Sequence, residues 1–125
     1  MATTDLTFDK FGSTIEENEI VLVDFWAGWC APCRMFAPIY DEASERHEDV
    51  VFGKVDTEAE QQLAAAAQIS SIPTLMAFRQ GIAVFRHSGV LQGAALDDII
   101  GQIKDLDMDD VRRQIEEAEQ QQKNN

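Results

Sequence analysis

The sequence predicts an α/β domain in which helices flank a central mixed β-sheet on both faces. Short apolar runs alternate with segments whose apolar residues recur at helical spacing, as in layered α/β architectures. The run Ile20–Trp26 is almost continuously apolar, which is expected of a strand buried on both faces. Segments 74–79 and 82–87, joined by Gln80-Gly81, have the pattern of an antiparallel hairpin, so the sheet is expected to mix strand directions.

The other elements follow from the spacing of apolar residues along the chain. Helices are predicted over 7–17, 33–47, 58–68 and 94–104, and a second core strand over 50–55. These elements complete one predicted domain that spans residues 1–105.

Composition indicates a folded, strongly acidic protein. A chain of 125 residues with 45% apolar and 26% charged residues suits a single globular domain. The formal net charge of −13 argues against nucleic acid or an anionic membrane surface as a partner. The first residues lack the pattern of a signal peptide, and no apolar run could span a bilayer, so a cytoplasmic location is expected.

Residues 106–125 are expected to form a separate acidic extension. Four apolar residues recur there in steps suited to a helix with a narrow apolar stripe, namely Met108, Val111, Ile115 and Ala118. Asp107 or Asp109 could cap this helix, and its end is expected to fray from Gln120 onward. A monomer is expected. A dimer formed through the tail is the alternative, because the stripe has coiled-coil spacing, although over less than three heptads.

The chemistry is expected at Trp29-Cys30-Ala31-Pro32-Cys33, shortly after the first core strand. If a helix opens at Ala31, Cys30 lies at its N-terminus, where unpaired N–H groups and the helix dipole favour a thiolate. Cys33 then lies one turn further on, within reach of a disulfide, and Pro32 suits an early helical position. In a reducing compartment such a pair indicates redox chemistry rather than a structural crosslink.

Neither a metal nor a bound organic cofactor is expected. Cys30 and Cys33 are the only cysteines, and His47 and His87 lie far from them and from each other in the sequence. No glycine-rich phosphate loop follows a strand, so the chain itself is not expected to bind a nucleotide.

These motifs resemble the thioredoxin family over roughly residues 5 to 105. The cysteine motif follows a strand as it does in that family, Ser71-Ile72-Pro73-Thr74-Leu75 matches the family's cis-proline loop, and Ser88-Gly89-Val90 matches its last substrate-facing loop. The resemblance implies the thioredoxin fold and a protein-disulfide reductase that works by dithiol–disulfide exchange. It is silent on the tail.

Four residues are expected to carry the reaction. Cys30 is the predicted attacking thiolate, and Cys33 is the predicted resolving thiol. Asp24 lies inside an apolar run, so desolvation should raise its pKa toward the range of a useful proton carrier. The resemblance implies that Asp24 helps to deprotonate Cys33, and that Lys54 lies near this acid and offsets part of the shift.

The resemblance also implies a substrate surface around Cys30. Its expected members are Trp29, Ala31, Pro32, Ile72, Pro73, Gly89 and Val90. A cis bond between Ile72 and Pro73 would leave the neighbouring backbone free to pair with an extended substrate segment.

The predicted function is that of a cytosolic thioredoxin, with protein disulfides as substrates and a separate thioredoxin reductase as partner. In this family, electrons come from NADPH through that flavin enzyme. Two alternatives remain. Ala31 replaces the family's usual glycine, so the chain could be a more oxidising thiol oxidoreductase with a specialised partner. The surface and the acidic tail could instead serve as a binding or chaperone module.

Overall fold

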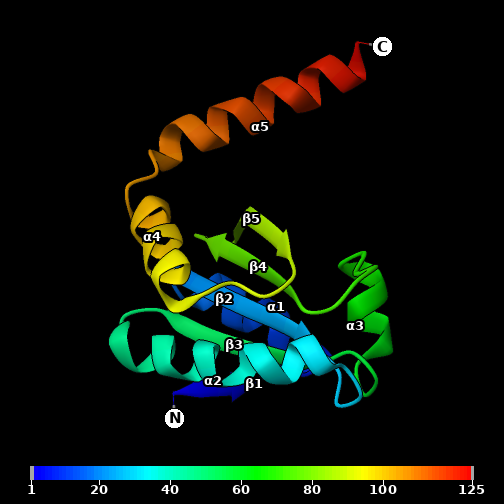
Figure 1. Ribbon diagram of the computed structural model, residues 1–125. Helices are drawn as coiled ribbons and strands as arrows, with labels where there is room; N and C mark the ends of the chain where they lie inside the picture. The colour runs from blue at the N-terminus through cyan, green and yellow to red at the C-terminus, as the bar shows by residue number, and fades with distance from the viewer. Residues whose placement is uncertain (1, 125) are drawn as a thin grey trace.

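The computed structural model describes residues 2–124 and contains a five-stranded sheet with the order β1-β3-β2-β4-β5 (Figure 1). The strands are β1 (Thr3–Asp5), β2 (Ile20–Trp26), β3 (Val51–Asp56), β4 (Thr74–Arg79) and β5 (Ile82–Ser88). Strands β1, β3 and β2 run parallel, whereas β4 is antiparallel to β2 and β5 is antiparallel to β4. The predicted mixed sheet is therefore confirmed.

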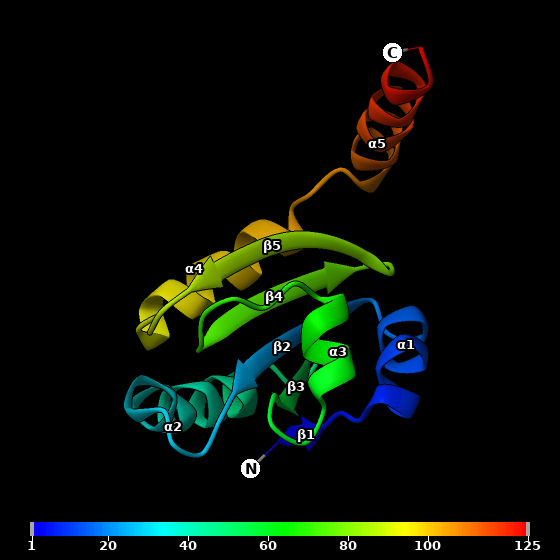
Figure 2. The same ribbon diagram turned by 90° about the vertical axis from the view of Figure 1, so that its right-hand side faces the viewer.

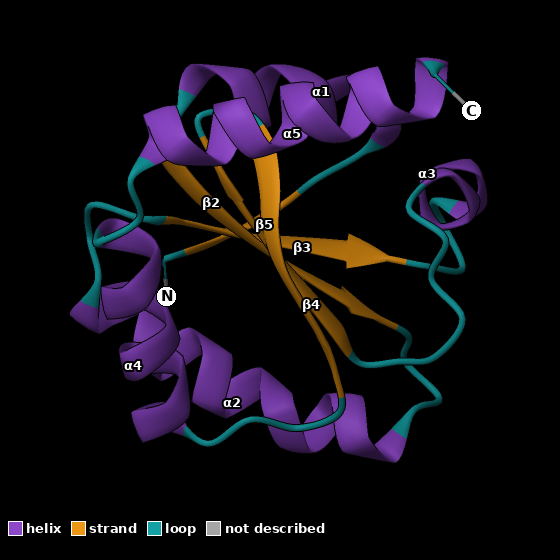
Figure 3. Ribbon diagram, turned by 90° about the horizontal axis from the view of Figure 1, so that it is seen from above, coloured by secondary structure: helices purple, strands orange, loops and turns teal. Residues whose placement is uncertain are grey.

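Two pairs of helices cover the two faces of this sheet (Figure 2). The helices are α1 (Phe8–Glu17), α2 (Ala31–Arg46), α3 (Gln61–Ala66), α4 (Gly93–Lys104) and α5 (Met108–Lys123). Helices α2 and α4 pack on one face, and α1 and α3 pack on the other, as the view from above also shows (Figure 3). Strand β2 lies between both layers, and all but its last residue are buried.

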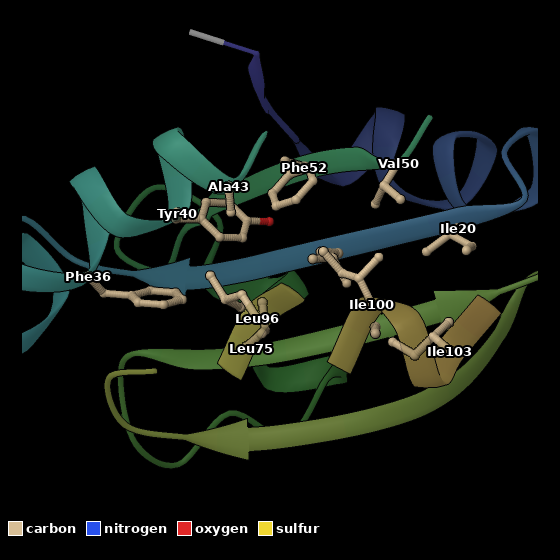
Figure 4. Close-up of a cluster of buried hydrophobic side chains, with 12 residues drawn as sticks. Ile20, Phe36, Tyr40, Ala43, Val50, Phe52, Leu75, Leu96, Ile100 and Ile103 are labelled. Atoms are coloured by element: carbon tan, nitrogen blue, oxygen red, sulfur yellow. The ribbon is translucent and has the colours of Figure 1, made fainter. Parts of the chain in front are cut away.

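The core on the α2 and α4 side joins the helices to strands β2, β3 and β4 (Figure 4). Its largest fully buried side chains include Phe36, Tyr40, Phe52, Leu75 and Leu96. The Tyr40 hydroxyl donates a hydrogen bond of 2.8 Å to the Gly53 carbonyl, so this buried polar group is satisfied. These contacts fix the axis of α2, whose first turn carries the cysteines.

Strand β1 has no counterpart in the sequence prediction. Thr3, Thr4 and Asp5 show no apolar alternation, so the sequence carries no strand signal there. They become a strand because they pair in parallel with the free edge of β3, with Thr3 opposite Phe52. The next residue, Leu6, is only 2% exposed, and its burial holds this edge strand in place.

Helix α3 is shorter than the predicted segment 58–68. The Asp56 carboxylate accepts hydrogen bonds from the backbone N–H groups of Glu58 and Ala59, which form a turn before the helix starts at Gln61. At the other end, Gln68 adopts a φ of 56°, which ends the helical path.

The tail forms helix α5, which extends away from the sheet (Figure 1). Asp107 caps it by accepting a hydrogen bond of 3.2 Å from the Asp110 backbone N–H, as the sequence led us to expect. The helix continues to Lys123, beyond the predicted onset of fraying at Gln120. No helix within residues 2–124 is long and apolar enough to cross a membrane.

Candidate active site

The two cysteines lie where strand β2 gives way to helix α2. Cys30 is the N-cap residue of α2, and its Sγ accepts a hydrogen bond of 3.2 Å from the Cys33 backbone N–H. The two residues form a disulfide, with their Cα atoms 5.2 Å apart, and both are only 3% exposed. A sulfur at this position meets the unpaired N–H groups of the helix start, which stabilise negative charge there.

The Cys30 side opens onto a surface groove of about 500 Å³. The groove is lined by Trp29, Cys30, Ala31, Pro32, Thr57, Ala64, Ile69, Ser70, Ser71 and Ile72. Most of its side chains are apolar, and the Trp29 side chain is 69% exposed. Such a surface suits an extended, partly apolar segment of another protein.

The bond between Ile72 and Pro73 is cis, and its loop lies against the Cys30 sulfur. The Ile72 carbonyl oxygen is 3.7 Å from Cys30 Sγ. The buried Thr74 hydroxyl holds the loop by donating a hydrogen bond of 2.6 Å to the Ser71 carbonyl, and it lies 3.1 Å from the Ser88 hydroxyl. The loop therefore has a defined position next to the disulfide.

Cys33 lines a different, inner cavity of about 110 Å³. The other lining residues are Asp24, Trp26, Ala27, Gly28, Arg34, Ala37 and Lys54. A space of this size, with the charged residues Asp24, Arg34 and Lys54 in its lining, is large enough for a few water molecules. Asp24 and Cys33 thus line the same small cavity.

The Asp24 side chain is 1% exposed, and within residues 2–124 neither of its carboxyl oxygens has a hydrogen-bond partner. Burial raises the pKa of Asp24 to about 7, the positive charge of Lys54 lowers it in part, and the negative charge of Asp41 raises it. The predicted direction of the shift and its cause are confirmed. A carboxyl that titrates near neutral pH can both take up and release a proton.

The structure places the proposed substrate residues in two groups. Trp29, Ala31, Pro32 and Ile72 line the groove with Cys30. The Gly89 backbone N–H donates a hydrogen bond of 2.8 Å to the Pro73 carbonyl, which holds the last loop beside the cis-proline. Val90 packs against the core between α2 and α4. Among the described residues, neither Gly89 nor Val90 is part of the groove lining.

Several groove residues were missed by the sequence analysis. Ile69, Ser70 and Ser71 directly precede the Ile72-Pro73 pair in the chain, and that neighbourhood could have indicated them. Thr57 and Ala64 give no local signal, because the loop after β3 brings Thr57 to the groove and the packing of α3 brings Ala64 there. Both the N–H and the hydroxyl of Thr57 donate hydrogen bonds to the Trp26 carbonyl, at 2.9 and 3.0 Å.

Thiol–disulfide exchange needs one sulfur that can meet a substrate and a second that stays shielded until the mixed disulfide forms. The groove and the inner cavity provide these two environments, so the fold and the site define a thiol–disulfide oxidoreductase. A family model described as thioredoxin matches residues 2–102, and the chain belongs to the thioredoxin family. No group of three or more His, Cys, Asp or Glu residues within 2–124 is arranged to hold a metal ion.

Known proteins support the same assignment. A putative thioredoxin 2 from Streptomyces coelicolor is 53% identical over 120 residues, which cover 96% of this chain and 90% of that protein. A bifunctional thioredoxin reductase/thioredoxin from Mycobacterium leprae is 42% identical over 94 residues, covering 74% of this chain and 20% of that protein. The structure of Plasmodium falciparum thioredoxin superposes with a TM-score of 0.75 at 35% identity, covering 80% of this chain and 98% of that one.

Proposed function

We propose that this protein is a cytoplasmic protein-disulfide reductase. The observation that carries the proposal is that the two cysteines line different spaces, Cys30 the groove beside the cis-proline loop and Cys33 the cavity that Asp24 also lines. This division matches the separate roles of an attacking and a resolving thiol. A cytoplasmic location suits a dithiol that must be kept reduced.

In the first step, the Cys30 thiolate attacks one sulfur of a substrate disulfide. The substrate's S–S bond breaks, a mixed disulfide forms at Cys30, and the second substrate sulfur leaves as a thiolate that takes a proton from water. The Ile72 carbonyl, close to the reacting sulfur, is available to accept a backbone hydrogen bond from an extended substrate.

In the second step, Cys33 resolves the mixed disulfide. The Cys33 thiol gives its proton to the Asp24 carboxylate through the inner cavity, and the resulting thiolate attacks Cys30 Sγ. The bond between Cys30 and the substrate breaks, and the substrate sulfur leaves as a thiolate. Two electrons have then passed from the dithiol to the substrate, and the Cys30–Cys33 disulfide has formed.

The oxidised protein must next be reduced by another enzyme. We assign this role to a thioredoxin reductase that carries electrons from NADPH, with no cofactor bound to this chain. The Mycobacterium leprae relative supports the assignment, because its name joins a thioredoxin reductase and a thioredoxin in one protein.

The direction of the reaction is tested by the reduction potential of the Cys30–Cys33 couple. The protein is equilibrated with glutathione buffers, and the fluorescence of Trp29, which adjoins the disulfide in sequence, reports the redox state. We expect a potential well below the cytosolic glutathione poise, together with reduction of a model protein disulfide in the presence of NADPH and thioredoxin reductase.

The matched control replaces both Cys30 and Cys33 by serine, which should abolish turnover and leave the fold intact. A potential well above the glutathione poise would instead make the protein an oxidant. Full biological activity in the doubly substituted protein would show that it acts as a binding module.

A further inference from the structure

The residues that line the inner cavity range from buried to exposed. Asp24, Ala27 and Cys33 are buried, Trp26, Ala37 and Lys54 are half-buried, and only Gly28 and Arg34 among the lining residues are exposed. Gly28 and Arg34 are therefore the lining residues that are most open to solvent. A path for water or protons between Asp24 and bulk solvent is available past these two residues.

A hydrogen bond joins these two exposed residues. One Nη atom of Arg34 donates to the Gly28 carbonyl over 2.8 Å, which links the first turn of α2 to the loop after β2. The guanidinium group is planar and rigid, so it can cover an opening as well as supply a charge. Arg34 directly follows Cys33 in the chain.

We propose that Arg34 is a positioning residue that closes the outer end of the Asp24 cavity through its hydrogen bond to Gly28, and so limits the entry of solvent to the carboxyl. The inference rests on the proposed function, in which Asp24 exchanges a proton with Cys33. Closure keeps the number of waters in the cavity small, so that the proton released by Cys33 passes to Asp24 rather than to bulk solvent.

The charges around Asp24 make it possible to distinguish closure of the cavity by Arg34 from a direct effect of the Arg34 charge on the Asp24 pKa. Besides desolvation, the charges that act on its carboxyl are those of Lys54 on β3 and Asp41 on α2. The neutral Tyr40 hydroxyl of α2 is occupied by the Gly53 carbonyl. Removing the Arg34 bond admits water and weakens the desolvation that raises the Asp24 pKa. Removing only a nearby positive charge would raise that pKa further.

The test follows the Asp24 carboxyl by carbon-13 NMR titration in the oxidised protein, where the cysteines do not titrate. Arg34→Gln removes the charge and is too short to reach the same carbonyl, and Arg34→Lys keeps the charge without the planar group. Closure predicts that the Asp24 midpoint falls in both variants, by about one pH unit in Arg34→Gln and by less in Arg34→Lys. Arg113→Gln, a charge loss on the remote helix α5, should leave the midpoint unchanged.

A higher midpoint in Arg34→Gln with no change in Arg34→Lys would overturn closure in favour of a charge effect. An unchanged midpoint in both variants would also overturn it. As a second readout, the pH profile for resolution of the mixed disulfide should move to lower pH together with the Asp24 midpoint. The titration involves no turnover, so its outcome is independent of whether the protein proves to be a reductase.

Discussion

Asp24 and Lys54 are directly opposite each other in the parallel pairing of β2 with β3, and both line the cavity that holds Cys33. The Lys54 ammonium lies 5.2 Å from the centre of the Trp26 ring, which positions the charge over an aromatic face. This pairing places a cation close to a desolvated carboxyl. The Asp24 pKa is therefore a balance between burial, which raises it, and Lys54, which lowers it.

Replacing Lys54 by methionine should raise the Asp24 pKa above its value of about 7. The expected increase is about one pH unit, since the opposing positive charge is lost while burial is retained. Carbon-13 titration of the carboxyl measures the change, and Lys123→Met on the exposed tail is the matched control. An unchanged Asp24 midpoint in Lys54→Met would show that the Lys54 ammonium does not lower the Asp24 pKa.

Replacing Asp24 by asparagine should remove a pH-dependent loss of stability. The folded-state pKa is raised from 3.8 to about 7, so the folded protein binds the proton more tightly than the unfolded chain. Stability is then greatest below the unfolded pKa and decreases as the pH rises through about 7, with a total change of about 4 kcal/mol.

Urea unfolding between pH 4 and pH 8 (about the range of this titration) measures the effect. In Asp24→Asn the free energy of unfolding should decrease less as the pH rises. At the alkaline end of the range the variant should therefore gain stability relative to the parent. Resolution of the mixed disulfide should slow more than its formation. An equal pH dependence in both proteins would mean that Asp24 is ionised throughout.

Replacing Cys33 by serine should trap substrate on Cys30. Cys30 lines the groove where substrate would bind, and the thiol that completes the reaction from the inner cavity is gone. A stable mixed disulfide should be visible by mass spectrometry. Cys30→Ser is the matched control and should trap little, because Cys33 lines the inner cavity. Equal trapping by both variants would show that Cys30 and Cys33 can each attack the substrate, which contradicts the assigned roles.

Replacing Thr74 by valine should loosen the cis-proline loop. The buried hydroxyl donates to the Ser71 carbonyl, so its loss leaves that group without this partner and should cost about 1–2 kcal/mol. We expect a higher KM for protein disulfides as well as a lower free energy of unfolding. Ser13→Ala removes a similar bond to the Lys10 carbonyl on an exposed helix surface, and should change stability by less than about 0.5 kcal/mol.

Deleting residues 108–125 should leave disulfide turnover within about twofold of the full chain, a factor worth less than 1 kcal/mol. Helix α5 extends away from the sheet (Figure 1), and the groove lining includes none of its described residues. Arg79 still donates to the carbonyls of Ile103, Lys104 and Leu106 in the shortened chain. Stability should fall modestly because Met108, which is 6% exposed, is lost from its packing. A large loss of turnover would assign the tail a part in the reaction.

Strand β2 and the cysteine motif could be predicted from residue order alone. The boundaries of β2 agree with the predicted strand, because burial between two helical layers requires an unbroken apolar run. The positions of Cys30 and Cys33 at the start of α2 also follow locally, since one helical turn separates them. These features depend on interactions between near neighbours in the chain.

Tertiary packing decided the features that depend on contacts between distant segments. Strand β1 exists because the free edge of β3 accepts it, and Thr57 reaches the groove only through the position of its loop beside Trp26. Lys54 can lower the Asp24 pKa, as predicted, only because the register of β2 against β3 places the two residues opposite each other. Local sequence patterns record burial and helical spacing, whereas cavities and cross-strand partners arise only when separate surfaces pack together.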